Sequence, residues 1–297
     1  MKEKKISDDS QIGVWVSEKS NDNYSMSFRV KDVLFSGQSE FQRVDVVDTF
    51  GYGKMLLNDG LVMVTEADEF IYHEMISHVP LFLHPEPKRV LVIGGGDGGT
   101  VREVLKHPSV EKCTLVEIDE MVINACKKHI TLTAACLSDN KRVEVLCQDG
   151  VKYAAETKEK FDVILVDSTD PVGPGAPLFG DAFYSDLSAC LSKNGIVVSQ
   201  GESPFIYAEM QKTLVEILNR QFKETYLYNY TNMTYPSGLW SFSLATNADI
   251  HPIENFYKEQ FDKLNLDLQY YTPEIHKASF YLPAFQKKRL KGLLSEI

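Results

Sequence analysis

Short stretches of alternating apolar and polar residues fill the first part of the chain. Examples are residues 25–30, 41–47 and 54–58. Alternation with a period of two predicts strands with one buried face, and the glycine-containing turns between them predict antiparallel hairpins. Asp59-Gly60 is a two-residue sequence that favours a hairpin turn. We therefore predict a small antiparallel β domain over residues 1–66.

The pattern changes after residue 66. Apolar residues have a helical spacing over 69–78, and short apolar runs then alternate with segments long enough for helices. The runs cover residues 89–93, 113–118, 143–146, 161–166 and 195–199. Such strands indicate a parallel sheet covered by helices on both faces. We predict that residues 67–297 form a doubly wound, Rossmann-like domain, which makes the fold class α/β. A domain of this kind binds ligands at the carboxyl ends of its strands. Trp240 lies in a segment predicted as a late strand and is expected in the core, and Trp15 is expected to pack within the β domain.

Composition limits where in the cell the protein can be expected. No apolar run approaches the roughly 18 residues of a membrane span, and the charged N-terminus lacks the apolar stretch of a secretory signal. The five cysteines are odd in number and form no CxxC pair, which fits reduced thiols and offers no zinc site. The histidines other than His73 show no spacing typical of metal ligands, so we interpret them as structural or surface residues. We expect a cytoplasmic protein that does not contact membranes.

The formal net charge is −11. Nucleic acid is a poor partner for such a chain, because phosphate binding requires a basic face. An acidic surface attracts cationic substrates over long distances. Many proteins are acidic for solubility alone, so the charge is consistent with a cationic substrate without arguing for one.

A glycine-rich segment, residues 94–99, follows the first apolar strand and opens a helix. It fits the G-x-G-x-x-G pattern, so NAD binding is an alternative. Asp97 is its one side chain beyond glycine. A carboxylate directed into this turn would repel a pyrophosphate by about 4 kcal/mol at about 4 Å and an effective dielectric near 20. If Asp97 points inward, the segment favours a ligand with a positive charge.

Acids also end the following strands. Glu117 can accept hydrogen bonds from ribose hydroxyls, which both NAD and adenosyl ligands carry. Asp149 fits two roles equally: it can accept from an adenine amino group or cap the next helix. Asp167 and Asp170 precede a Pro/Gly-rich loop with the composition of a lid, and they favour ligand binding because Asp181 is expected to cap the helix that follows. These strand ends suit a polycationic ligand better than a phosphate.

Several motifs together resemble the spermidine synthases along nearly the whole chain. They are residues 39–42, 68–75, 94–99, 167–171 and 234–238. The resemblance implies decarboxylated S-adenosylmethionine as aminopropyl donor, putrescine as acceptor, no cofactor and no metal. It also implies a homodimer or homotetramer. Two segments, 129–136 and 201–205, depart from the family pattern, and the second borders the expected acceptor channel.

The resemblance also implies roles for individual residues. Those expected to hold the donor are Gln42, His73, Asp97, Glu117, Asp149, Gly150 and Pro174. Those expected to line the diamine channel are Tyr72, Asp167, Asp170, Gln200 and Tyr235. Asp167 is the expected proton acceptor, because diamines are protonated at neutral pH and the attacking nitrogen must be neutral. Asp97 is also expected to repel the carboxylate of ordinary S-adenosylmethionine.

Three alternatives remain open. A methyltransferase that uses intact S-adenosylmethionine shares this framework. An NAD-dependent dehydrogenase fits the glycine motif but not the acidic strand ends. An inactive polyamine-binding protein is disfavoured by the Asp167/Asp170 pair. The preferred acceptor also stays open among putrescine, cadaverine, agmatine and spermidine.

Overall fold

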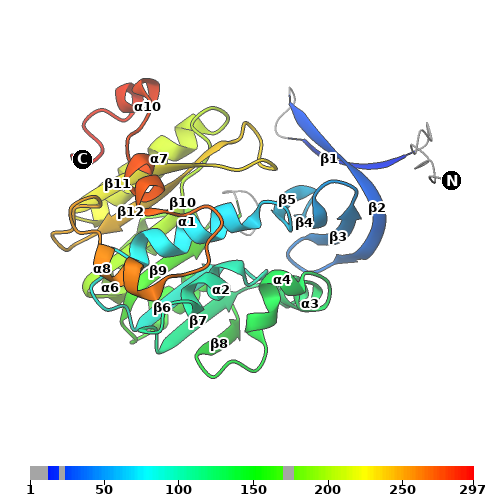
Figure 1. The fold of residues 1–297 in the computed structure, drawn as a ribbon, viewed down its shortest axis with the longest axis horizontal. Coiled ribbons are helices and arrows are strands. Elements are labelled where there is room, and N and C mark those ends of the chain that lie inside the picture. Colours follow the sequence, from blue (N-terminus) through cyan, green and yellow to red (C-terminus); the bar gives the residue numbers. More distant parts are fainter. Residues whose placement is uncertain (1–12, 20–23, 170–176) are drawn as a thin grey trace.

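The computed structural model describes residues 13–19, 24–169 and 177–297, which form two sheets with helices around the larger one (Figure 1). The smaller sheet has five strands in the order β1-β2-β3-β4-β5. Their bounds are β1 Val14–Lys19, β2 Ser25–Gln38, β3 Arg43–Thr49, β4 Gly53–Asn58 and β5 Leu61–Thr65. All neighbours pair antiparallel, as the alternation predicted.

The turn between β4 and β5 is the predicted Asp59-Gly60 hairpin. Both residues have positive φ, 49° and 82°, as this type of two-residue turn requires. The alternating side chains divide between the faces of the sheet. Val46 and Leu56 join the large core next to α1, whereas Met55 and Leu57 pack in a separate cluster on the opposite face.

The larger sheet has seven strands in the order β11-β12-β10-β9-β6-β7-β8. Their bounds are β6 Arg89–Gly94, β7 Lys112–Glu117, β8 Val143–Cys147, β9 Phe161–Asp167, β10 Leu191–Gln200, β11 Glu224–Thr231 and β12 Leu239–Thr246. The five predicted strands, β6 to β10, pair in parallel. The hairpin of β11 and β12 adds antiparallel to β10, so the sheet is mixed.

Helices cover both faces of this sheet, as predicted. They are α1 Glu69–Leu81, α2 Gly99–Leu105, α3 Glu120–His129, α4 Thr131–Ala134, α5 Gly150–Glu156, α6 Asp181–Cys190, α7 Ala208–Gln221, α8 Lys258–Leu264, α9 Pro273–Ser279 and α10 Ala284–Arg289, with a 3₁₀ turn, η1, at Ala135–Leu137. Residues of β6 alternate between two cores. Val90 and Val92 pack on the side of α1, and Leu91 and Ile93 pack on the side of α6. The described residues include no helix that is long and apolar enough to cross a membrane.

Two expectations about single residues are wrong. Asp181 is the first residue of α6 rather than its cap; Gly180 holds the cap position, and the Asp181 carboxylate instead pairs with Arg220 at 2.7 Å. Trp15 is 58% exposed and does not pack inside the small sheet. Trp240 is buried in the core, as predicted, where its indole N–H donates to the carbonyl of Pro236.

Candidate active site

A cavity of about 470 Å³ lies at the carboxyl ends of the parallel strands, where the small sheet approaches the large one. This volume is within the range of sites for small molecules. The cavity collects predicted site residues from both sheets and from α1. They are Gln42, Tyr72, His73, Asp97, Glu117, Asp149, Gly150, Asp167, Gln200 and Tyr235. Asp170, Pro174 and most of the predicted lid lie outside the described residues.

Asp167 ends β9, and its carboxylate accepts hydrogen bonds from two hydroxyl groups. Tyr72 Oη donates to its Oδ1 at 2.7 Å, and Thr100 Oγ1 donates to its Oδ2 at 2.6 Å. The glycine loop passes close to this carboxylate. Gly95 has φ of +67°, and a Cβ there would lie 2.5 Å from Asp167 Oδ2. The loop therefore needs glycine to wrap around the acid.

Burial and the nearby charge of Asp97 raise the pKa of Asp167, although His73 and the two hydroxyl donors oppose the shift. A pKa raised above the ordinary value of a carboxyl lies closer to neutrality. Asp167 is therefore better suited to accept a proton and pass it on than an ordinary surface aspartate.

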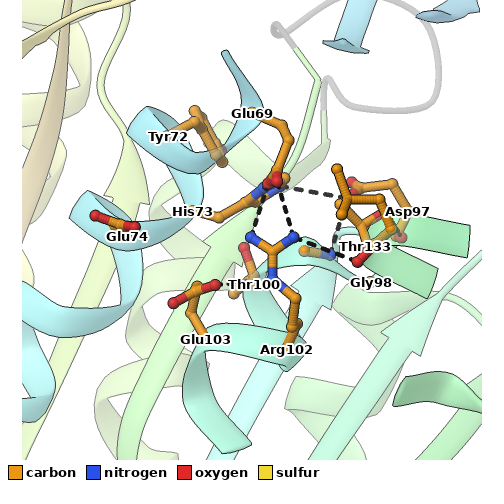
Figure 2. A network of polar contacts seen from close by, with 12 residues as sticks. Glu69, Tyr72, His73, Glu74, Asp97, Gly98, Thr100, Arg102, Glu103 and Thr133 are labelled. Carbon is orange, nitrogen blue, oxygen red and sulfur yellow. Dashed lines mark hydrogen bonds and ion pairs between the residues drawn. The ribbon is translucent and has the colours of Figure 1, made fainter. Parts of the chain in front are cut away.

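His73 lies beside Tyr72 on α1 and contacts two carboxylates (Figure 2). Its Nδ1 donates to Glu69 Oε2 at 2.6 Å, and its Nε2 is 3.2 Å from Asp97 Oδ1. Burial alone would lower the pKa of His73, but Asp97 and Glu69 outweigh it and raise the pKa to about 10. The ring is thus a buried imidazolium at neutral pH.

Asp97 lines the cavity, which resolves the orientation that its sequence left open. Its Oδ1 accepts from the backbone N–H of Gly99 at 2.9 Å as well as facing His73. Burial opposes ionisation, but His73 and this hydrogen bond lower the pKa of Asp97 below its ordinary value. The sequence argument treated Asp97 as a lone charge. The structure corrects this, because a histidinium compensates part of that charge.

Glu117 ends β7, and Asp149 lies between β8 and α5. Glu117 accepts hydrogen bonds from the backbone N–H groups of Gly96, at 3.2 Å, and Asp119, at 2.9 Å. Burial nevertheless raises the pKa of Glu117 to about 7. Asp149 caps α5 by accepting from Val151 N at 2.8 Å, and it also lines the cavity. A cap of α5 can therefore also face a ligand in the cavity, so the two roles that the sequence allowed for Asp149 are compatible.

The small sheet supplies one wall. Gln42 Nε2 donates to Asp119 Oδ2 at 3.1 Å, and Ser39 Oγ donates to the same oxygen at 2.7 Å. Glu18, a buried acid of β1, also lines the cavity and accepts from Val62 N at 2.9 Å. Sequence reasoning missed Glu18, because an acid in an alternating strand is normally assigned to the solvent side.

Aromatic rings form another wall. The Tyr235 ring packs edge-on against Tyr72 and Trp240, with centroid separations of 6.1 and 5.3 Å. Its hydroxyl donates to the carbonyl of Met63 at 2.6 Å. Gln200, at the end of β10, lines the same cavity. An apolar wall with acids at its edges suits a polymethylene chain that carries amines.

His73, Asp97 and Asp167 are also grouped tightly enough to resemble a metal site, with one potential ligand atom from each within 4.8 Å of the others. A metal requires a deprotonated nitrogen. Both nitrogens of His73 face carboxylates, and its pKa of about 10 keeps the ring protonated. The donor set therefore fits a network of charge pairs better than a metal centre.

Comparisons with known proteins agree on one family. Residues 69–258 match the spermine/spermidine synthase domain, and residues 14–66 match the spermidine synthase tetramerisation domain. A polyamine aminopropyltransferase of Methanocaldococcus jannaschii is 46% identical over 289 residues, which cover 96% of this chain and 98% of the relative.

Solved structures give the same result. A spermidine synthase in complex with the transition state analogue AdoDATO has a TM-score of 0.91 and 43% identity, covering 93% of this chain and 94% of the other. The spermidine synthase of Thermotoga maritima has a TM-score of 0.88 and 41% identity, covering 95% of each chain. The chain therefore belongs to the spermine/spermidine synthase family and is an aminopropyltransferase of polyamine biosynthesis.

Proposed function

We propose that the enzyme transfers the aminopropyl group of decarboxylated S-adenosylmethionine to putrescine, which gives spermidine and methylthioadenosine. One observation carries the proposal. Asp97 and Asp167 line the same cavity, next to an aromatic wall and to the strand end that Glu117 occupies. The cavity thus offers carboxylates to two cationic substrates at once.

The reaction needs no nucleophilic side chain, because the sulfonium of the donor already activates the adjacent methylene. A neutral amine of putrescine attacks that carbon, the carbon–sulfur bond breaks, and methylthioadenosine leaves with the electron pair on sulfur. Before the attack, one ammonium group of putrescine gives a proton to Asp167, which leaves the attacking nitrogen neutral. Alignment of the two reactants accounts for most of the remaining acceleration.

We propose for the donor the roles that the family resemblance implies, and the position of these residues around one cavity supports them. Glu117 would accept from the ribose hydroxyls, Asp149 and Gly150 would contact the adenine, and Gln42 would close the site from the small sheet. Asp97, held by the protonated His73, would face the aminopropyl amine. Pro174, outside the described residues, is retained as a contact of the adenosine.

We likewise propose for the acceptor the roles that the resemblance implies, which the aromatic wall of the cavity supports. Tyr72 and Gln200 would orient the attacking nitrogen, and Tyr235 would flank the carbon chain. Asp170, also outside the described residues, is retained as a partner of the diamine. Glu18 adds a buried acid to the same cavity, which supports a second cationic group at that end.

We propose catalysis without a cofactor or metal, in line with the protonated state of His73. We also propose that the chain assembles into dimers or tetramers, which the match of residues 14–66 to a tetramerisation domain supports. The five free cysteines support a reducing, cytoplasmic location.

A panel of acceptors tests the proposal. The enzyme is incubated with decarboxylated S-adenosylmethionine and putrescine, cadaverine, agmatine or spermidine, and products are identified by mass spectrometry. We expect spermidine and methylthioadenosine in equal amounts, with putrescine turned over fastest. Preference for another acceptor would overturn the assignment of putrescine. Adenosylhomocysteine from intact S-adenosylmethionine, without methylthioadenosine, would instead indicate a methyltransferase.

A further inference from the structure

We propose that Glu69 and Arg102 are positioning residues, which fix the His73 ring so that its Nε2 donates to Asp97 on the donor side of the cavity. Both lie behind His73, outside the residues that line the cavity. Their effect on the donor rests on the proposed function, whereas their effect on His73 does not depend on it.

The first step is the contact between Glu69 and His73. The two residues are four positions apart on α1 and therefore lie on the same face of the helix. A neutral imidazole has one nitrogen that donates and one that accepts. Both nitrogens of His73 face carboxylate oxygens, at 2.6 and 3.2 Å, and a carboxylate cannot donate. The geometry is satisfied only when both nitrogens carry protons.

The second step is the guanidinium of Arg102, on α2. Its Nη1 and Nη2 donate to Glu69 Oε1 and Oε2 at 2.8 and 2.9 Å, in a bidentate arrangement (Figure 2). Its Nε donates to Glu103 at 2.8 Å. A fork of this kind fixes the plane of a carboxylate as well as its charge. Glu69 can therefore direct His73 in one orientation only.

The third step is Gly99, the first residue of α2. A Cβ at Gly99 would overlap the His73 ring, so the ring occupies the space that glycine leaves empty. The N–H of the same residue donates to Asp97. Gly99 therefore places the ring and its acceptor relative to one backbone segment, while Glu69 holds the ring from the other side.

The charged groups that face His73 come from four elements. They are Glu69 on α1, Arg102 on α2 through Glu69, Asp97 in the glycine loop, and Asp167 at the end of β9. Positive and negative charges alternate along the row Arg102, Glu69, His73 and Asp97. Removing the charge of Glu69 would leave His73 with Arg102 behind it and Asp97 in front.

A merely structural role, the joining of α1 to α2, is the competing explanation. Glu74 provides a matched control, because it lies on the same helix, is buried, and points away from the network (Figure 2). Its carboxylate accepts from the backbone N–H groups of residues 269–271. Glu74→Gln therefore removes a buried charge from α1 without touching His73.

The primary experiment follows the His73 ring by NMR in full-length, histidine-labelled protein without substrate. In the wild type we expect the imidazolium to persist through neutral pH. In Glu69→Gln we expect its midpoint to fall by about one to three pH units, the range that one adjacent opposite charge produces. Glu74→Gln should leave the His73 midpoint unchanged, even if it lowers the melting temperature as much as Glu69→Gln does. An unchanged His73 midpoint in Glu69→Gln would overturn the proposal.

Kinetics then link the ring to the donor. Glu69→Gln and Arg102→Met should raise KM for decarboxylated S-adenosylmethionine about 10-fold or more, with a smaller change in kcat, because a hydrogen bond to a charged group is misaligned. Arg102→Lys should restore part of the loss. If KM for putrescine rises instead, the proposed link to the donor is wrong.

Two further variants serve as a test if Glu69→Gln or Arg102→Met does not fold. Gly99→Ala displaces the ring without removing a charge and should also raise the donor KM, whereas Gly51→Ala, where a Cβ meets open space, should not. Equal effects of these two would count against the proposal. A protein without any aminopropyl transfer would refute the proposed function, yet the NMR titration would still decide the role of Glu69.

Discussion

Tyr72 on helix α1 donates its phenolic hydrogen to Asp167 at the end of β9, across 2.7 Å, although 95 positions separate the two in the chain. The bond favours the carboxylate form of Asp167, while burial and Asp97 favour the protonated form. The balance of these effects sets the pH at which Asp167 can accept a proton.

Tyr72→Phe should shift this balance. Without the hydroxyl, the pKa of Asp167 rises further, so the acidic limb of the kcat/KM profile should move to higher pH by about one unit. Tyr228→Phe is a matched control, because the buried Tyr228 hydroxyl donates to the carbonyl of Met75 at 3.1 Å instead. The measurement is a pH–rate profile for both variants. Identical profiles would show that the Tyr72 hydroxyl does not act on Asp167.

Asp97→Asn should weaken the preference for the decarboxylated donor. Under the proposed function, the wild-type carboxylate would repel the carboxylate of ordinary S-adenosylmethionine. We therefore expect the ratio of dissociation constants for the two donors to fall about 10-fold, which corresponds to about 1.4 kcal/mol. Asp149→Asn makes the same change elsewhere in the cavity, at the start of α5, and keeps a good helix cap, so the ratio should stay constant. Calorimetric titration measures both. A ratio unaffected by Asp97→Asn would remove this residue from discrimination.

Glu117 should make nucleoside binding depend on pH. Its pKa of about 7 means that the carboxylate fraction increases as pH rises from 6 to 8. Since the ionised form is the better acceptor for ribose hydroxyls, methylthioadenosine should bind more tightly at pH 8 than at pH 6, by up to about tenfold. Methylthioadenosine is the suitable probe because it lacks the amine. In Glu117→Gln the dependence should disappear; its persistence would assign it to another group.

His276 should make stability depend on pH. Burial lowers its pKa to about 4, although the Pro252 carbonyl, at 2.8 Å from Nε2, opposes the shift. The unfolded ring takes up a proton near pH 6.5, whereas the folded ring stays neutral until about pH 4. The free energy of unfolding therefore falls as pH decreases through this window, by at most about 3 kcal/mol. Urea denaturation of His276→Gln should show a flatter dependence between pH 6.5 and 4. A slope equal to that of the wild type would contradict the assignment.

The strands of the large sheet could be predicted because their signal is local. A run such as 89–93 is apolar on both faces, and this composition leaves few alternatives to a buried parallel strand. Acids directly after such strands must lie at one edge of the sheet, so Glu117 and Asp167 could be assigned to one cavity before any coordinates. The prediction of Asp181 as a helix cap was wrong. The boundary of α6 differs by one residue from the expected one, and this shift makes a cap residue into a residue of the first turn.

The charge state of His73 could not be predicted. It depends on Asp97, 24 residues along the chain, and on Arg102 through Glu69, and none of these spacings forms a motif. The burial of Glu18 could not be predicted either, because it results from the approach of β1 to β5, the two outer strands of the small sheet. Local patterns specify elements, but electrostatic partners are brought together by tertiary packing.

Asp119 receives Ser39 and Gln42 from the small sheet, and its other oxygen accepts from the N–H of Met121 at the start of α3. A single carboxylate thereby joins the segment before β3 to α3, the helix that follows β7. A movement that separates residues 39–42 from the start of α3 would stretch these hydrogen bonds. The spacing between the two sides of the cavity is therefore held in part by a side chain that does not line it.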